Sequence, residues 1–297
     1  MSARERVREV LADAGAQGWV HAIRLGGDGV RQLDAGADEL VVTASVYKLP
    51  LLVALGRAFD TGALDPRERV LVDPTSCTPG PTGVSTFQDP VQMSWRDLAA
   101  SMMAVSDNAA ADVILGAVGL EAVADALDAA GLHRTRVIGG TADAHAALVE
   151  EMGASNAAEA FALLADNDEA RTVRAYDPSF SSATTPREMT RLMELIWADE
   201  VASPEQCAFI RRLLGQQAWM HRVRAGFPFR GVAVAGKTGT IGAIRNEVSV
   251  VEFDGEAPVA VAVFTLAARA DPELPRVDAA IAECARIAVT DLRSGRL

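Results

Sequence analysis

The stretch Thr43-Ala44-Ser45-Val46-Tyr47-Lys48-Leu49-Pro50 leads from a short apolar segment into a helical pattern. Ser45 therefore falls at the start of a predicted helix, where backbone N–H groups favour a developing negative charge. Lys48 follows three residues later, about one helical turn along the same face. A desolvated lysine there has a lowered pKa and can accept the serine proton. A lone Ser-x-x-Lys more often marks a helix cap and a solvated lysine, so the motif needs support from elsewhere.

A second polar cluster, Ser106-Asp107-Asn108, joins two predicted helices at residues 95–105 and 108–115. A hydroxyl at this turn can relay a proton to a leaving group, and the Asn108 amide can bind a substrate carbonyl. The same three residues are also good helix-capping residues. By itself, capping is the more economical interpretation.

A third cluster, Lys237-Thr238-Gly239-Thr240, follows the apolar run Val232-Ala233-Val234-Ala235-Gly236 and ends a predicted strand. Gly239 leaves room for a ligand to lie along the backbone, and Lys237 with Thr238 can hold a substrate carboxylate. The alternative is a lysine that protects an edge strand from further pairing.

Working outward from these clusters, we expect strands near both ends of the chain and helices between them. The predicted strands cover residues 19–25, 30–33, 232–238, 247–253 and 259–266, and the terminal helices cover 4–14 and 276–292. The fold class is therefore α/β, of the α+β type, with one antiparallel sheet built from both termini, flanking helices and an inserted all-helical subdomain. We expect the cleft at the seam between sheet and helices.

The whole chain, 1–297, is predicted to form a single domain with two subdomains. The discontinuous α/β subdomain takes residues 1–43 plus 205–297, and the helical subdomain takes 44–204. Within and after that range, helices are expected at 49–59, 95–105, 108–115, 121–130, in an alanine-rich stretch at 144–164, and at 186–197 and 204–214. Residues 73–90 are rich in Pro, Gly, Thr and Ser and predict a long surface loop.

Composition limits the partners. With 40 acidic and 28 basic residues the formal charge is −12, which disfavours a nucleic acid or an anionic membrane and favours a small-molecule substrate. No apolar run approaches the roughly 18 residues of a membrane span. The four histidines lack metal-ligand spacing, so we expect no metal and no cofactor. The charged, amphipathic first eleven residues predict a cytoplasmic protein, and the oligomeric state stays open.

The three clusters together, in this order and context, resemble those of class A serine β-lactamases and the related penicillin-recognising peptidases. The resemblance spans nearly the whole chain and extends to residues 44–50, 103–110, 184–189, 224–228 and 245–246. It implies that Ser45 is the acylated nucleophile, Lys48 its general base and Ser106 the proton shuttle. It also implies that substrate is held by Asn108, Lys237, Thr238, Gly239, Thr240 and Arg245, with the backbone N–H groups of Ser45 and Thr240 forming the oxyanion hole.

One departure from that family pattern concerns release of the acyl group. Class A β-lactamases carry a Glu-x-x-Leu-Asn segment whose glutamate activates the deacylating water, and this sequence has none. Counting back from Pro186 makes Glu169 the candidate base, although Ala170-Arg171-Thr172-Val173 follows it without an asparagine. Two hypotheses remain open: a β-lactam hydrolase that uses Glu169 or another base, or a cytosolic esterase, peptidase, acyltransferase or slow-releasing penicillin-binding protein.

Overall fold

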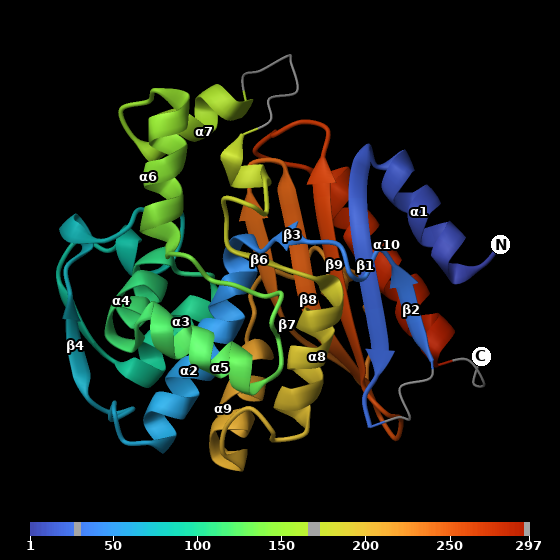
Figure 1. The fold of residues 1–297 in the computed structure, drawn as a ribbon, viewed down its shortest axis with the longest axis horizontal. Helices are drawn as coiled ribbons and strands as arrows, with labels where there is room; N and C mark the ends of the chain where they lie inside the picture. The colour runs from blue at the N-terminus through green and yellow to red at the C-terminus, as the bar shows by residue number, and fades with distance from the viewer. Residues whose placement is uncertain (27–30, 166–172, 294–297) are drawn as a thin grey trace.

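A five-stranded antiparallel sheet forms one side of the molecule (Figure 1). The computed structural model describes residues 1–26, 31–165 and 173–293. The strand order is β2-β1-β9-β8-β7, so strands from the two ends of the chain lie side by side. Their bounds are β1 Ala16–Arg24, β2 Gln32–Ala35, β7 Val232–Ile241, β8 Ile244–Phe253 and β9 Val259–Ala267. The predicted sheet from both termini is confirmed.

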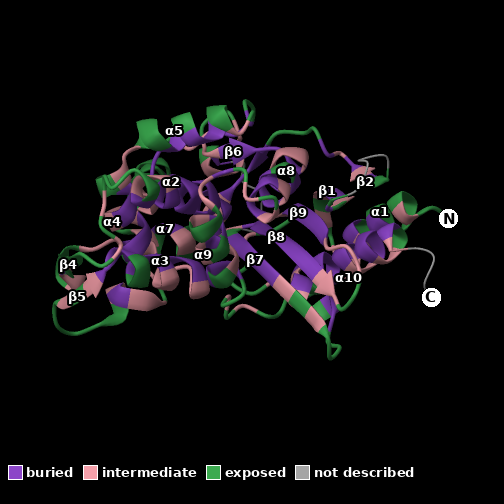
Figure 2. Cartoon of the chain, turned by 90° about the horizontal axis from the view of Figure 1, so that it is seen from below, coloured by how far each residue is buried: buried purple, intermediate pink, exposed green. Residues whose placement is uncertain are grey.

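Helices cover both faces of this sheet. On one face α10 (Pro275–Leu292) packs against β1, β8 and β9, and α1 (Ala3–Asp13) packs on α10. On the other face α8 (Pro186–Trp197) crosses β1, β8 and β9. Because both faces are covered, β8 and β9 are buried along most of their length (Figure 2). This burial explains why β9 reads as a nearly continuous apolar run, whereas β8 also carries buried polar residues, among them Asn246 and Glu247.

The remaining helices form a block beside the sheet, with α2 (Lys48–Asp60) at its centre (Figure 1). Every residue of α2 from Lys48 to Gly56 is buried, because α4, α5 and α9 surround it. The neighbouring helices are α3 Trp95–Ala104, α4 Asn108–Val118, α5 Leu120–Ala129 and α9 Pro204–Leu214. Their predicted positions are confirmed to within a few residues. The subdomain boundaries at 43/44 and 204/205 stay a prediction.

Two small strand pairs, of which three strands lie inside the predicted helical subdomain 44–204, were not expected. β3 (Val41–Val42) pairs with β6 (Ala183–Thr184), and β4 (Arg69–Val72) pairs with β5 (Val91–Ser94). Strands of two to four residues are too short to show a periodic pattern. The β3–β6 pair lies directly before the segment that carries Ser45, and it therefore helps to fix the entrance to that segment.

The alanine-rich stretch forms two helices where one was expected. α6 (Thr141–Met152) ends at Gly153, which adopts a left-handed conformation with φ 63°, and α7 (Ala157–Ala165) follows. The N–H of Ala154 bonds back to the carbonyl of Val149, which closes the helix end. Glycine at this position stops the helix because other residues rarely adopt such a φ. The two helices pack against each other at the top of the view in Figure 1.

The predicted loop at 73–90 is anchored to the neighbouring helices by the buried carboxylate of Asp107. Asp107 is fully buried and accepts hydrogen bonds from the backbone N–H of Val84 (2.9 Å), the hydroxyl of Ser101 (2.7 Å) and the N–H of Ala110 (3.1 Å). Gly83 has a φ of +79°, and a Cβ there would lie 2.1 Å from the Asp107 carboxyl carbon. The loop is thus tied to α3 and to the start of α4.

We expect Asp107→Ala to lower the free energy of unfolding by about 2–4 kcal/mol, because three buried donors lose a charged acceptor. Urea denaturation followed by circular dichroism measures the change. Asp89→Ala is the matched control, since Asp89 is exposed in the same loop. Equal stability of the two variants would contradict this role for Asp107.

Candidate active site

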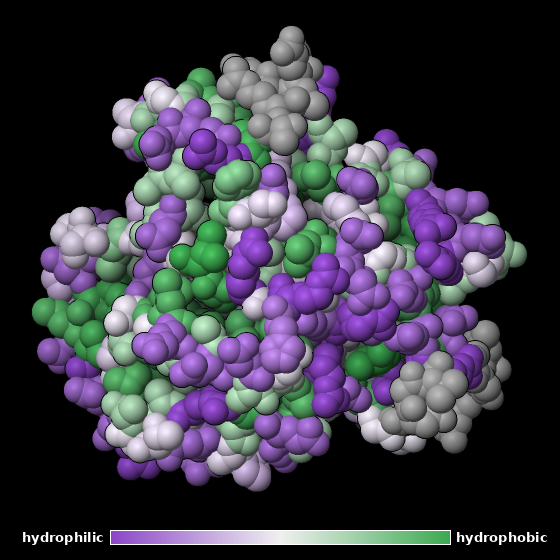
Figure 3. All heavy atoms as spheres, in the orientation of Figure 1, coloured by the Kyte–Doolittle hydropathy of each residue, from purple (hydrophilic) through white to green (hydrophobic). Residues whose placement is uncertain are grey.

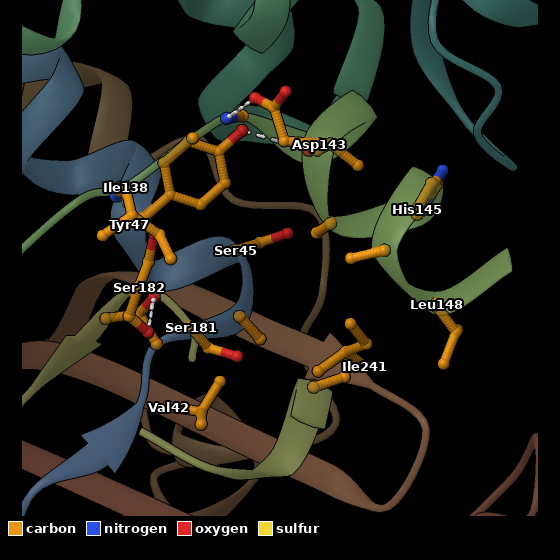
Figure 4. A pocket seen from close by; sticks show the side chains of 18 of the residues that line it. Val42, Ser45, Tyr47, Ile138, Asp143, His145, Leu148, Ser181, Ser182 and Ile241 are labelled. Carbon is orange, nitrogen blue, oxygen red and sulfur yellow. Dashed lines mark hydrogen bonds between the residues drawn. The ribbon is translucent and has the colours of Figure 1, made fainter. Parts of the chain in front are cut away.

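Ser45 lies in a 3-10 turn, Ala44–Tyr47, that leads directly into α2. The preceding residue, Ala44, has a φ of 45°, an uncommon conformation for a residue with a side chain. Ser45 is half-buried, and in the part of the chain that the structure describes no group hydrogen-bonds to its hydroxyl. Figure 4 shows the side chain pointing into open space below α6. The hydroxyl is therefore accessible to a substrate.

Lys48, the first residue of α2, is fully buried beside the second polar cluster. Its Nζ donates to the Ser106 carbonyl (2.7 Å) and to Asn108 Oδ1 (2.9 Å), and the Ser106 hydroxyl lies 3.4 Å away. Burial lowers the pKa of Lys48 to about 7, although the charge of Asp107 partly opposes the shift. A substantial fraction of Lys48 is thus the neutral amine near neutral pH.

The Ser106 hydroxyl connects two lysines. Its Oγ accepts a hydrogen bond from Lys237 Nζ at 2.9 Å and faces Lys48 Nζ on the other side. Ser106 has a φ of 60°, an uncommon conformation for a residue with a side chain. Burial lowers the pKa of Lys237 well below its usual value, and the charges of Lys48 and Arg222 lower it further. The structure thus brings Lys48, Ser106, Asn108 and Lys237 into one cluster.

Strand β7 approaches the Ser45 turn closely because Gly239 has no side chain. A Cβ at Gly239 would lie 2.7 Å from the Thr43 carbonyl oxygen and 3.3 Å from the Ala44 Cβ. Close approach of this kind is a typical reason for glycine within a strand. It brings the end of β7, with Thr240, alongside Ser45.

The outer edge of β7 is held by a side-chain network that the sequence did not reveal. The Thr238 N–H donates to Gln217 Oε1 (2.7 Å), and the Gln217 amide donates to Glu247 Oε1 (3.1 Å). Glu247 is fully buried, and burial raises the pKa of its carboxyl. The contacts join residues 21 and 30 positions apart, so no local pattern could have shown them.

Two arginines lie behind the end of β7. Buried Arg222 donates to Asp278 Oδ1 (2.6 Å), to the Gly239 carbonyl (2.9 Å) and to Thr240 Oγ1 (2.8 Å). Arg222 was not predicted from the sequence, although it lies two residues before a segment that resembles the family. Arg245 donates to the carbonyls of Ile244, Gly242, Asp271 and Pro272. Its expected role in substrate binding stays a prediction.

Ser45 lies between two hollows. One has a volume of about 390 Å³ and lies under α6 (Figure 4). The other has a volume of about 660 Å³ and is lined by Arg222, Arg245 and Thr238. Ser45, Asn108 and Thr240 belong to the walls of both hollows. A substrate with its reactive carbonyl at Ser45 can therefore extend in two directions.

Glu169, the expected deacylating base, lies outside the described residues. Among those described, Tyr47 and Thr141 occupy the wall next to Ser45, and their hydroxyls are 3.0 Å apart. The Thr141 hydroxyl also lies 3.5 Å from Asn108 Oδ1. Burial raises the pKa of Tyr47, so this phenol stays protonated. Neither residue was singled out from the sequence, although Tyr47 lies inside the Ser-x-x-Lys motif.

Comparison with known proteins defines the class. The sequence profile of the β-lactamase enzyme family matches residues 2–292. The chain is 28% identical over 270 residues to the β-lactamase regulatory protein BlaB of Streptomyces cacaoi, covering 86% of each protein. The chain therefore belongs to the β-lactamase enzyme family and is a serine hydrolase that resembles class A β-lactamases.

Two solved structures show the same fold. An ancestral class A β-lactamase (GNCA) superposes with a TM-score of 0.78 at 23% identity, covering 98% of this chain and all of that one. A mutant of PBP-A, in an acyl-enzyme complex with penicillin-G, gives a TM-score of 0.76 at 20% identity, with 98% and 96% coverage. The predicted fold class is confirmed.

We expect Gly239→Ala to slow the reaction with p-nitrophenyl acetate roughly a hundredfold, because the added Cβ displaces β7 from the Ser45 turn by a fraction of an ångström or more. Stopped-flow absorbance measures the rate. Gly116→Ala, on the exposed face of α4, is the control because a Cβ there meets nothing within 4 Å. A Gly239→Ala rate within twofold of the control would contradict the close-approach argument.

Proposed function

We propose that the chain cleaves an amide or ester, most favourably a β-lactam ring, through an acyl intermediate on Ser45. The hydrogen-bonded series Lys48, Ser106 and Lys237 carries this proposal, because Ser106 and Ser45 line the same hollow. A nucleophile needs a nearby base in its neutral form, and buried Lys48 supplies one. Because the chain resembles class A β-lactamases, the β-lactam amide is the first substrate to test.

In the proposed reaction Lys48 takes the proton as Ser45 Oγ attacks the carbonyl carbon. The proton passes to Ser106, whose hydroxyl lies 3.4 Å from Lys48 Nζ in the unliganded site, and then to the leaving nitrogen or oxygen. Lys237 donates to Ser106 Oγ and keeps this hydroxyl oriented. The bond from the carbonyl carbon to this leaving nitrogen or oxygen breaks, and the acyl group stays on Ser45.

Substrate binding is assigned to the surrounding groups. Asn108 would bind the substrate amide, and the backbone N–H groups of Ser45 and Thr240 would form the oxyanion hole. A carboxylate of the substrate would lie at the end of β7, beside Lys237 and Thr238, with Arg245 and the second hollow behind. There it would restore the charged form of Lys237, since an anion raises the pKa of a buried ammonium.

A slow-releasing penicillin-binding or regulatory protein is the second candidate. The carboxylates that line the first hollow are already engaged with backbone N–H groups: Asp143 accepts from Gly140 at 2.8 Å and Glu151 from Arg174 at 3.0 Å. Neither is therefore a ready base for a deacylating water. BlaB, which matches over most of its length, is named a β-lactamase regulatory protein. Glu169 remains the proposed base for full turnover.

A small-molecule substrate and a cytoplasmic location complete the proposal. Over the described residues, no helix combines the length and the apolar character needed to cross a bilayer. Cys77, Cys207 and Cys284 are free thiols, which fits a reducing compartment.

Incubation with a chromogenic cephalosporin and a p-nitrophenyl ester, followed by intact mass and product together, tests the proposal. We expect an adduct on Ser45, with fast product for a hydrolase and a persistent adduct for a slow-releasing binder. Ser45→Ala should lose both signals. Retained activity in this variant would reject the mechanism.

The pH dependence of adduct formation tests the role of Lys48. Because the neutral amine is the base and the pKa of Lys48 is about 7, the acylation rate should rise as pH increases through 7 and level off above it. Lys48→Arg, which stays protonated, should lose acylation and this rise, with circular dichroism confirming that the variant folds. The same profile in Lys48→Arg would exclude Lys48 as the base.

A further inference from the structure

The 390 Å³ hollow beside Ser45 is built by the helical pair α6 and α7 together with the end of β7. Figure 4 shows Ser45 pointing into it, with Leu148 and Ile241 facing one another across its far side. Sequence analysis noted residues 144–164 as an alanine-rich helical stretch but gave it no function. The structure places this stretch as one wall of the space into which the Ser45 hydroxyl opens.

The wall is mainly apolar. α6 contributes Ala144, Ala147 and Leu148, α7 contributes Phe161, and β7 contributes Ile241. Hydrophobic side chains also gather around the foot of α6 on the face drawn in Figure 3. Together these side chains offer an environment that favours hydrocarbon over water.

Two large hydrophobic side chains lie exposed at the rim of the hollow. Ile138 is 52% exposed and Phe180 is 60% exposed. Exposed hydrophobic side chains gathered at a cavity are characteristic of ligand-binding sites. An apolar group that enters the hollow would cover both of them.

Several polar side chains that line the hollow already interact with other parts of the protein. Asp143 and Glu151 accept from backbone N–H groups. The His145 ring packs edge-on against Phe161 at 5.6 Å, and its Nδ1 is buried without a partner. Burial lowers the pKa of His145, with the charge of Lys48 also lowering it and Asp112 raising it, so the ring is neutral at pH 7. Arg174 lies over the Phe180 ring at 5.7 Å.

The hollow on the other side of Ser45 differs in the cations that line it. Arg222 and Arg245 belong to its wall, together with the acidic Asp278 and Glu273, and Lys237 is buried next to Thr238. In the proposed complex an anionic group of the substrate would lie on that side, at the end of β7, and the acyl group would lie under α6.

We propose that the α6–α7 hollow is an acyl-chain pocket, which selects substrates whose acyl group is an unbranched apolar chain or an aryl group. This inference rests on the proposed acylation of Ser45. If each heavy atom takes about 30 Å³, the share of one water in the liquid, the hollow holds roughly a dozen. The pocket thus suits acyl chains of up to about ten carbons and leaves acetyl groups poorly held.

A series of p-nitrophenyl esters from acetyl to decanoyl, used below their micelle concentrations, tests the pocket with one leaving group. We expect the acylation rate constant kcat/KM to rise about fourfold for each added methylene through the series up to decanoyl. A flat or falling series, with Ser45 still acylated by the acetyl ester, would overturn the pocket alone. Failure of every ester and β-lactam to acylate Ser45 would overturn the proposed function and the pocket with it.

A second test reduces the volume of the pocket by substitution and measures the preference for long acyl chains. Ala147→Leu places a larger side chain in the wall, and Ala146→Leu makes the same change one position away, on α6 but outside the wall. We expect the octanoyl-to-acetyl ratio of kcat/KM to fall at least tenfold in Ala147→Leu and to stay within about twofold of the wild-type ratio in Ala146→Leu. Equal ratios in the two variants would overturn the pocket.

Discussion

The site depends on the burial of two lysines around one hydroxyl. Lys48 and Lys237 are both fully buried, and both face Ser106 Oγ. Removing an ammonium from water costs several kcal/mol, and carbonyl and hydroxyl acceptors offset only part of this cost. Burial therefore lowers the pKa of both amines. It is therefore unfavourable for both lysines to be protonated at once. A neutral lysine can act as a base, and a substrate carboxylate that binds nearby favours the protonated form of the other lysine.

That cluster exists because three separate chain segments are fixed against each other. α2 starts at Lys48, α4 starts at Asn108 with Asp107 as its cap, and β7 lies against the Ser45 turn at Gly239. The β7 edge is in turn tied through Gln217 to buried Glu247. Two helix starts and one strand edge are rigid positions. The polar groups are therefore already oriented, and they lose little conformational entropy when substrate binds.

The sequence predicts these rigid elements well because their signals are local. Four of the five strands of the sheet are nine or ten residues long and lie near the two ends of the chain, and two of the polar clusters fall where helices begin. Contacts between distant residues were not predictable: Tyr47 meets Thr141, 94 positions away, and Gln217 meets Glu247. β4 pairs with β5 across the 73–90 loop on only four residues each, and the stop at Gly153 depends on a single φ angle. Such features follow from packing and not from periodicity.

The sequence departs from the family pattern between the second polar cluster and Pro186, where the Glu-x-x-Leu-Asn segment is missing. The same part of the chain forms α6 and α7, which line the first hollow. Among the described residues, Thr141 at the start of α6 contacts both Tyr47 and Asn108, and α7 follows α6. A hydroxyl at that position donates and accepts hydrogen bonds but does not act as a strong base at neutral pH. In the proposed reaction, acylation and deacylation would therefore depend on different parts of the molecule. The lysine cluster contains no residue of α6, whereas a water that releases the acyl group would reach Ser45 from the side of α6.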